Sequence, residues 1–497
     1  MNKYIYIYIL LAAIVAMGFE SCNKKDDSAD ITITDYSVYS SATTLVSGFS
    51  LKDNEKVASN LSKVQFAIDQ DQGVIYNADS LPRGTKVTAL CVDVTCATTV
   101  SSREFIIKNG TVQSDTVIQY TSSTKDSIDF TGDVTLRITS RDGLHERNYR
   151  VKVNVHKQDP DSIFWNVGSR SELPNVTGTL ISSKTVRQND KFLCLVHDNS
   201  SYVLNTIDTL MLEGWTKQVL TLPFVPQVGS FAATADALYL LDQNGELFKS
   251  GDMGLSWSDC GVAWNTIIGA YDTRVLGVKK DGSVFRHDEY PQPSGFAGGE
   301  VAEGFPVAGM SQLVRARNEW TSSQQAMIMG GIKADGGACN AVWGYDGKRW
   351  GIISQNASVL PALRNPVLIN YYSYVKSTSD NTFVKNLTWL VMGGLLSDGE
   401  INTVTYVSHD QGIHWVKGES GLQQPAHMPS FFGAQAFTVS RIVRNSSLLA
   451  YNPGHVTPVT QWDSPYIYLF GGYDVGGNAL NSIWEGILVG LTYKPVF

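Results

Sequence analysis

Short apolar segments separated by polar turns make up most of the chain from residue 31 onward. The clearest pair is Val134–Thr139 and Tyr149–Val155, in which apolar and polar residues alternate on either side of Asp142-Gly143. Alternation with a period of two on both sides of an Asp-Gly turn is typical of a half-buried β-hairpin. Several such segments in residues 33–157 predict a β-sandwich.

The longer part of the chain, residues 158–497, repeats one pattern. Each repeat has an aliphatic run, a turn with glycine and a second strand that contains an aromatic residue. The runs begin near Leu193, Ala237, Arg274, Met327, Trp389 and Ile467. Self-similar β-segments spaced by roughly 55 residues are typical of β-propeller blades with long connections. The pattern predicts six blades or seven, with a β-helix or two unrelated β-domains as alternatives.

Three of the runs end in a Gly-Gly pair, at Gly330-Gly331, Gly393-Gly394 and Gly471-Gly472. An aromatic residue follows each pair at the same distance along the chain. Glycine at the end of a strand indicates a close approach of another backbone. These motifs resemble those of kelch-type blades, and the resemblance implies a propeller.

Two segments, Ser250–Trp257 and Ser408–Trp415, share a Ser-x-Asp-x-Gly pattern that ends in tryptophan. We expect the Asp and Ser side chains to accept backbone N–H groups of the turn, glycine to take the left-handed conformation, and the indole to pack beneath the hairpin. The segments resemble the Asp-boxes of sialidase-like propellers, which implies a structural role. The residues concerned are Ser250, Asp252, Gly254, Trp257, Ser408, Asp410, Gly412 and Trp415.

The N-terminus has the pattern of an export signal. Lys3 precedes an uncharged, mostly apolar run, Tyr4–Phe19, which is short for a bilayer span of about 20 residues. An uncleaved membrane anchor is the alternative. The segment that ends at Cys22 resembles the lipoboxes of Bacteroidota lipoproteins, and Asn23–Ser28 resembles their export signal to the cell surface. The resemblance implies a signal peptide over 1–21, acylation of Cys22, a tether over 22–32 and an outer-membrane protein that faces the exterior.

The segment that closes the first domain resembles the ends of Ig-like modules in Bacteroidota surface lipoproteins, which implies a spacer. The whole chain is therefore expected to be all-β: an N-terminal Ig-like β-sandwich (33–157) followed by a six-bladed or seven-bladed β-propeller (158–497). It resembles Bacteroidota outer-membrane lipoproteins with a kelch or Asp-box propeller.

Charge and cysteine content narrow the possible partners. A net charge of −8 with no long basic run argues against binding to nucleic acid. Of six cysteines, five remain once Cys22 is acylated, and none has the spacing of a zinc site. We expect buried free thiols, with a Cys91–Cys96 disulfide as the alternative. No metal or cofactor is predicted.

The sequence contains no G-x-S-x-G, H-E-x-x-H or P-loop motif, and no pair of carboxylates stands out. No catalytic residue is assigned. We expect a non-catalytic surface protein that binds a glycan or another protein through its propeller, in polysaccharide utilisation. The alternatives are a glycoside-active enzyme with its site in the propeller mouth and an accessory of an outer-membrane transporter complex.

A glycan is expected to contact exposed aromatic rings on long loops between Gly331 and Gly472, because loops beyond the needs of the blades are free to carry recognition. Sugar rings stack their C–H faces on flat aromatic side chains. The candidate residues are Trp350, Tyr371, Tyr372, Tyr374 and Trp462. Alternation along a strand places Tyr372 and Tyr374 on one face and Tyr371 on the other.

Overall fold

The computed structural model describes residues 42–489, except 59, 78–79, 109–114, 122–125, 157–160, 167–170, 211–212, 297, 319–320, 356–358, 377–382 and 445–460. The side chains of 374–376, 383–384, 442–444 and 461–464 are also outside the description. Residues 1–32, with the expected signal peptide, Cys22 and tether, lie outside the described residues. In the described part, no helix is long and apolar enough to cross a membrane.

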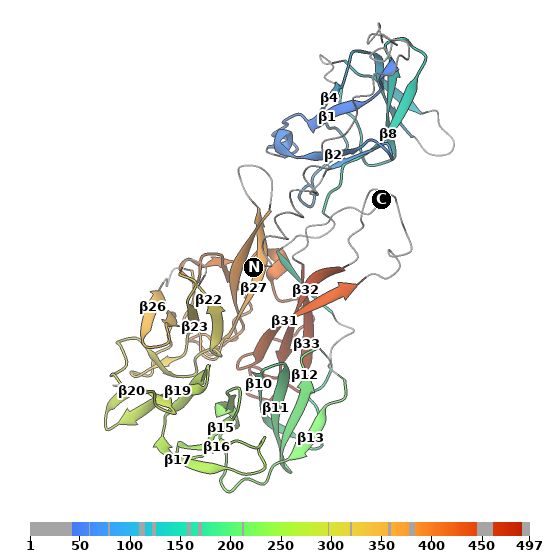
Figure 1. The fold of residues 1–497 in the computed structure, drawn as a ribbon. Coiled ribbons are helices and arrows are strands. Elements are labelled where there is room, and N and C mark those ends of the chain that lie inside the picture. Colours follow the sequence, from blue (N-terminus) through green and yellow to red (C-terminus); the bar gives the residue numbers. More distant parts are fainter. Residues whose placement is uncertain are drawn as a thin grey trace, which may run out of the picture.

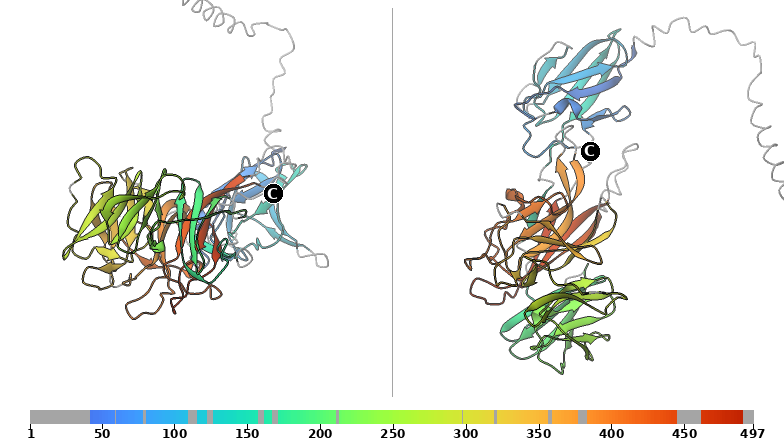
Figure 2. Two further views of the ribbon diagram at one scale, coloured as in Figure 1. Left: turned by 90° about the horizontal axis from the view of Figure 1, so that it is seen from below. Right: turned by 90° about the vertical axis from the view of Figure 1, so that its left-hand side faces the viewer.

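Almost every described element is a strand (Figure 1). The short 3-10 turns are η1 (Leu61–Lys63), η3 (Val228–Ser230) and η4 (Ser420–Leu422). The strands fall into two bodies, one formed by β1–β8 and the other by β9–β33, which Figure 2 shows as separate parts of the molecule. The expectation of an all-β chain is therefore confirmed.

The N-terminal body has a six-stranded sheet in the order β2-β3-β8-β7-β5-β6 and a two-stranded sheet β1-β4. Apolar side chains from both sheets share one core, since Val46 and Val92 pack in the same buried cluster as Leu136 and Val151. The strands are β1 (Val46–Leu51), β2 (Phe66–Asp69), β3 (Val74–Asn77), β4 (Val92–Cys96), β5 (Val100–Ile107), β6 (Thr116–Gln119), β7 (Val134–Ser140) and β8 (Glu146–Lys152).

The hairpin read from the alternation is β7–β8. Along β7, buried residues alternate with half-buried ones from Val134 to Ser140. Asp142 accepts hydrogen bonds from the Ser140 hydroxyl and the Leu144 amide (2.9 Å for the latter), which fixes the turn. β8 also pairs with β3 in parallel, so the hairpin lies inside the sheet and not at its edge.

Six sheets of three or four strands make up most of the described residues from 161 to 489. They contain β10 (Leu180–Gln188), β11 (Lys191–Asp198), β12 (Tyr202–Asp208), β13 (Thr216–Val219); β14 (Ala232–Ala233), β15 (Leu238–Leu241), β16 (Glu246–Ser250), β17 (Ser258–Ala263); β18 (Thr266–Tyr271), β19 (Arg274–Asp281), β20 (Val284–Tyr290); β22 (Val314–Arg317), β23 (Gln324–Met329), β25 (Val342–Tyr345), β26 (Trp350–Ser354); β27 (Val367–Lys376), β28 (Phe383–Met392), β29 (Tyr406–Ser408), β30 (Val416–Lys417); and β31 (Gln435–Arg444), β32 (Gln461–Phe470), β33 (Ile483–Val489), β9 (Ser162–Trp165). A small extra sheet pairs β21 (Pro306–Ala308) with β24 (Ile332–Lys333).

The sixth sheet contains both ends of this body. Its strands β31, β32 and β33 come from the end of the described chain, whereas its outermost strand β9 precedes all the other sheets. β9 pairs with β33 in antiparallel register from Gly486↔Trp165 to Val489↔Ser162. The first strand of the domain therefore completes the last sheet.

The six aliphatic runs are the second strands of the six sheets: β11, β15, β19, β23, β28 and β32. The sequence analysis used these runs to count the blades, and in the structure each run follows one earlier strand of its sheet. Second strands are buried on both faces, as in β11, where all residues from Phe192 to Val196 are buried. First strands have mixed residues because one side faces the centre of the body, so they lack this signal.

The Gly-Gly pairs end second strands at points where backbone approaches closely, and all six glycines have positive φ. A Cβ on Gly330 would lie 2.4 Å from the carbonyl oxygen of Leu363, and one on Gly393 would lie 2.5 Å from that of Phe431. Leu363 and Phe431 belong to the segments that enter the next sheet. The glycines thus make room for the chain that passes between sheets.

The turns Ser250–Trp257 and Ser408–Trp415 have the same hydrogen bonds. In the first, Ser250 Oγ donates to Asp252 and accepts from the Gly254 amide at 2.8 Å, and Trp257 Nε1 donates to the Gly254 carbonyl at 3.3 Å. Gly254 has φ +89°. Side-chain hydroxyl and carboxylate groups thus satisfy the backbone of the turn.

In the second turn, Ser408 Oγ donates to Asp410 and accepts from the Gly412 amide at 3.0 Å, and Trp415 Nε1 donates to the Gly412 carbonyl at 2.9 Å. Each turn also packs on the preceding sheet. A Cβ on Gly412 would meet Met327 of the fourth sheet, and one on Gly254 would meet Leu220, which follows β13 of the first.

The five described cysteines, Cys91, Cys96, Cys194, Cys260 and Cys339, are free thiols. Cys194 and Cys339 are buried and the other three are half-buried. Burial raises the pKa of the Cys194 thiol to about 12, which keeps it protonated and unreactive. The Cys91–Cys96 disulfide left open by the sequence is not formed.

Candidate ligand-binding cavity

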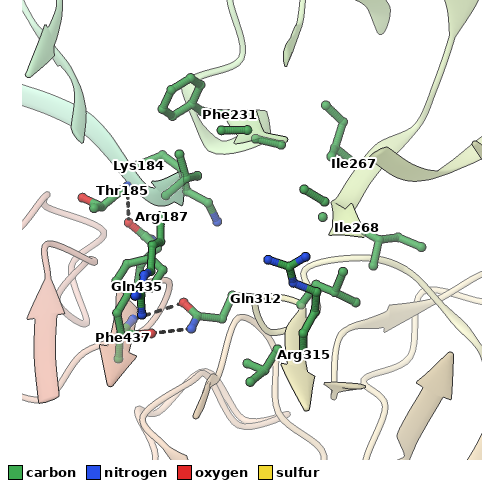
Figure 3. A pocket seen from close by; sticks show the side chains of 18 of the residues that line it. Lys184, Thr185, Arg187, Phe231, Ile267, Ile268, Gln312, Arg315, Gln435 and Phe437 are labelled. Carbon is green, nitrogen blue, oxygen red and sulfur yellow. Dashed lines mark hydrogen bonds between the residues drawn. The ribbon is translucent and has the colours of Figure 1, made fainter. Parts of the chain in front are cut away.

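A cavity of about 460 Å³ lies where the six sheets meet (Figure 3). Its wall is formed by the first strand of every sheet: β10, β14 with the preceding η3, β18, β22, β27 and β31. These strands are also neighbours of one another, since β10 contacts both β14 and β31, and β27 contacts both β22 and β31. The cavity is therefore central to the body, and its size is that of a small-molecule site.

Three cationic side chains line this cavity, and the lining contains no carboxylate. Lys184 and Arg187 come from β10 of the first sheet, and Arg315 comes from β22 of the fourth. Figure 3 shows the Arg315 guanidinium group directed into the cavity from the side opposite β10. The wall is thus positively charged in a protein whose net charge is −8.

The two arginines have only weak ion pairs. Arg187 lies 3.7 Å from Asp190, and Arg315 lies 3.7 Å from Asp272. Both aspartates are more than half exposed, so water screens these contacts. Arg187 is held by its own strand end, because its Nε donates to the Asn189 carbonyl at 3.0 Å.

Lys184 forms no ion pair with any described residue. Its side chain is half-buried in the wall of the cavity, and desolvation lowers the pKa of Lys184 to about 8. The lysine is therefore mostly charged at neutral pH without a carboxylate partner, and its partial desolvation is unfavourable.

Side-chain amides brace the wall between the cations. Gln435 of β31 accepts a hydrogen bond from the Thr185 amide of β10 at 2.9 Å, which joins the sixth sheet to the first. Gln312 accepts one from the Ala436 amide at 3.1 Å and so links the fourth sheet to the sixth. These hydrogen bonds to the glutamine side chains fix the strands that carry the cations.

The remaining lining is largely apolar. Ile267 of β18 and Phe437 of β31 are half-buried in the wall, while Phe231, which precedes β14, is 3% exposed (Figure 3). Ile267 and Phe437 give a ligand an apolar surface beside the charged one. The wall therefore suits a molecule with a flat or apolar body and a charged substituent.

Of the five aromatic residues expected to bind a glycan, Trp350, Tyr371 and Tyr372 have described side chains, and none of these three lines the cavity. The three tyrosines lie in strand β27 and not in a loop, which corrects the sequence reading. Tyr371 is 4% exposed, and its hydroxyl donates to Asp161 at 2.9 Å. Desolvation and the nearby carboxylate raise the pKa of Tyr371 well above its usual value. Its ring is not available for stacking on a sugar.

Trp350 is half-buried in β26 and packs among aromatic rings, with its centroid 5.1 Å from that of Tyr345 and 5.2 Å from that of Phe305. Tyr372 is 48% exposed, with the Lys385 ammonium 4.4 Å from its ring centre. Exposure of Tyr372 beside buried Tyr371 follows the predicted alternation. The side chains of Tyr374 and Trp462 lie outside the description.

A second polar cluster joins the beginning of the domain to the fifth sheet. Asp161 accepts the Tyr371 hydroxyl and lies 3.7 Å from His409 Nε2, while His409 Nδ1 contacts the Thr388 hydroxyl at 2.9 Å. Burial raises the pKa of the Asp161 carboxyl. The cluster fastens the chain just before β9. No group of three or more described His, Cys, Asp or Glu side chains is placed to hold a metal ion.

Six sheets around a common cavity define the second body as a β-propeller. The chain belongs to the DUF6242 family, since the family model for the "DUF6242 beta propeller domain" matches residues 159–496 and that for its N-terminal domain matches residues 33–153. A comparison with curated proteins found no match.

Solved structures with a similar chain path are distant. They include the structure of YjhT, with 14% identity, 63% of this chain and 96% of that chain covered and a TM-score of 0.38. An auxiliary nutrient binding protein from Bacteroides ovatus has 11% identity, coverage of 81% and 94% and a TM-score of 0.35. The six-bladed lectin of Aleuria aurantia has 13% identity, coverage of 64% and 99% and a TM-score of 0.31.

Proposed function

We propose that this protein binds a ligand in the central cavity of its propeller without transforming it, and that the ligand is a glycan or part of a protein partner. The observation that carries the proposal is the cavity wall, to which all six first strands contribute. Among the described lining residues there is no carboxylate, whereas glycoside hydrolysis uses a pair of them. The wall offers cations, amides and apolar side chains, which are groups that hold a ligand.

The rest of the molecule is proposed to present this cavity. The six sheets act as six blades, and the turns Ser250–Trp257 and Ser408–Trp415 act as structural Asp-boxes that pack each blade on the preceding one. The N-terminal body, an Ig-like sandwich in this proposal, serves as a spacer. Its shared core and the hairpin β7–β8 support the sandwich part of this proposal.

The test of this function uses the chain from residue 23 onward on a glycan array that carries neutral and acidic saccharides. Gly229 lines the cavity without positive φ, and a Cβ there would meet nothing within 4 Å. Gly229→Trp should therefore fill the cavity at little structural cost and abolish binding. Gly351→Trp is the matched control, because Gly351 has equal room in β26 outside the cavity. Equal binding by both variants would move the site elsewhere.

We further propose that the protein is a lipoprotein of the outer membrane, held at the cell surface through acylated Cys22. Two or more acyl chains give stable anchoring where a single chain is marginal. Mass spectrometry of the protein extracted from membranes should identify an N-terminal peptide that begins at Cys22 and carries lipid mass. Cys22→Ala should release the protein or leave the precursor uncleaved. Mature protein with an unmodified Cys22 would contradict the proposal.

A further inference from the structure

We propose that the cavity recognises an anionic group, the carboxylate or sulfate of an acidic saccharide, between Lys184, Arg187 and Arg315. This inference rests on the proposed function and specifies the class of ligand. It is drawn from the charges of the wall, from the state of Lys184 and from the size of the cavity.

The first step is the charge of the wall. The chain has 47 acidic and 39 basic residues, so the average surface is acidic. The cavity wall nevertheless contains three cations and no acid. Lys184 is half-buried and partly desolvated without a carboxylate partner, and an anionic ligand offsets that cost when it binds.

The second step is the availability of the three side chains. Lys184 has no ion pair, and the carboxylates near Arg187 and Arg315 are 3.7 Å away and 89% and 64% exposed. The Arg187 and Arg315 side chains are 39% and 54% exposed and are not taken up by these weak contacts, so both guanidinium groups are accessible to an anion in the cavity. Guanidinium forks match the geometry of carboxylate and sulfate oxygens.

The third step is the size and shape of the ligand. A cavity of about 460 Å³ is large enough for one or two sugar rings and too small for a double-stranded polymer. The half-buried side chains of Ile267 and Phe437 also line the cavity and give an apolar surface for the C–H face of a ring. A sugar acid has both matching features, because its ring has apolar C–H faces and it carries an anionic group.

Lys184 makes the binding depend on pH. The other charged side chains of the wall are Arg187 on the same strand and Arg315 on β22, while η3, β14, β18, β27 and β31 contribute no titratable side chain to the wall. The pKa of Lys184 is about 8 without ligand, and a bound anion raises it. Affinity should therefore fall as the pH rises through about 8, because the free protein loses the lysine charge while both arginines keep theirs.

The experiment is calorimetric titration of the chain from residue 23 onward with glucuronate, glucose and inorganic sulfate. Glucuronate and glucose differ in one charged group on the same ring, so glucuronate should bind about tenfold more tightly or better. Lys184→Met, Arg187→Gln and Arg315→Gln should each weaken glucuronate binding by about tenfold. Lys184→Met should also remove the decline of affinity between about pH 7 and pH 9.

Arg286→Gln is the matched control. The Arg286 side chain is 38% exposed and lies 3.6 Å from Asp281, which closely resembles Arg187, but it is outside the cavity. It should leave affinity unchanged. Sulfate should bind weakly and compete with glucuronate. In case a variant unfolds, the unaltered protein gives a second measurement: sulfate should raise its melting temperature above that in chloride of equal ionic strength.

Three results would overturn the inference: glucose binding as tightly as glucuronate, an equal loss of affinity in Arg286→Gln, or no protection by sulfate. If sulfate binds as tightly as glucuronate, the inference that the anion belongs to a saccharide would be wrong. Binding of neutral glycans that Gly229→Trp abolishes and the charge variants leave intact would reject the anion site but keep the proposed function. If Gly229→Trp leaves glucuronate binding unchanged, the cavity is not the binding site, and both this inference and the proposed function would be wrong.

Discussion

Replacement of Trp415 by alanine is expected to lower the free energy of unfolding by about 3–5 kcal/mol. The indole is 2% exposed in a core cluster that includes Met327, Val342 and Trp389 from two sheets. The substitution removes that packing together with the 2.9 Å hydrogen bond to Gly412. The measurement is chemical denaturation followed by circular dichroism.

Trp257→Ala is the comparison, because Trp257 occupies the same position in the equivalent turn. Its ring is only half-buried, and its hydrogen bond to Gly254 is longer, at 3.3 Å. We expect about half the loss found at Trp415, since a half-buried side chain gives up less packing. A greater loss at Trp257 would mean that the turns do not act through packing on the preceding sheet.

Replacement of Glu289 by alanine is expected to cost about 3–5 kcal/mol, because it leaves a largely buried arginine without its acid. Glu289 is 5% exposed and lies 2.8 Å from Arg274 Nε, and it also accepts the Tyr345 hydroxyl. Arg274 in turn donates to the Gly347 carbonyl at 2.7 Å. The group joins the third sheet to the fourth.

The double variant Arg274→Met with Glu289→Met distinguishes the loss of stability caused by an unpaired charge from the loss caused by missing packing. Replacing both members of a buried ion pair by apolar side chains is often neutral or stabilising. The double variant should therefore be more stable than Glu289→Ala, as measured by the denaturation midpoint. If it is the less stable of the two, the ion pair itself contributes net stability and our reasoning on the unpaired charge is wrong.

The sequence was informative where burial is strongest. All six aliphatic runs form second strands, since these are covered on both faces and must be continuously apolar. The first strands escaped notice because each has one side toward the cavity, and β22 reads Val-Arg-Ala-Arg. The cations of the wall lie in these strands. Arg187 and Arg315 lie in the strands that precede two of the aliphatic runs, and that position is the signal that could have found them.

The choice of Tyr371 failed for a related reason. Three tyrosines in four positions suggested an exposed cluster, but β27 is a first strand whose buried face packs on the neighbouring sheet. Tyr371 packs in a buried cluster with Ile163 and Trp165, and its hydroxyl contacts Asp161, which is 210 residues away in sequence. A contact between residues so distant arises only when the sheets assemble, and no local pattern records it.

The pairing of β9 with β33 has a consequence for the order of events during synthesis. The segment around β9 leaves the ribosome early, whereas its partner strand is made much later. The separation is also seen at Leu173, whose backbone amide donates a hydrogen bond to the Asn481 side chain 308 residues away. Until β33 has been made, β9 has no strand with which to pair. Its unpaired edge can pair with another chain during that time. Folding of the propeller is therefore expected to finish only after nearly the whole domain has been made, with slow kinetics set by this long-range contact.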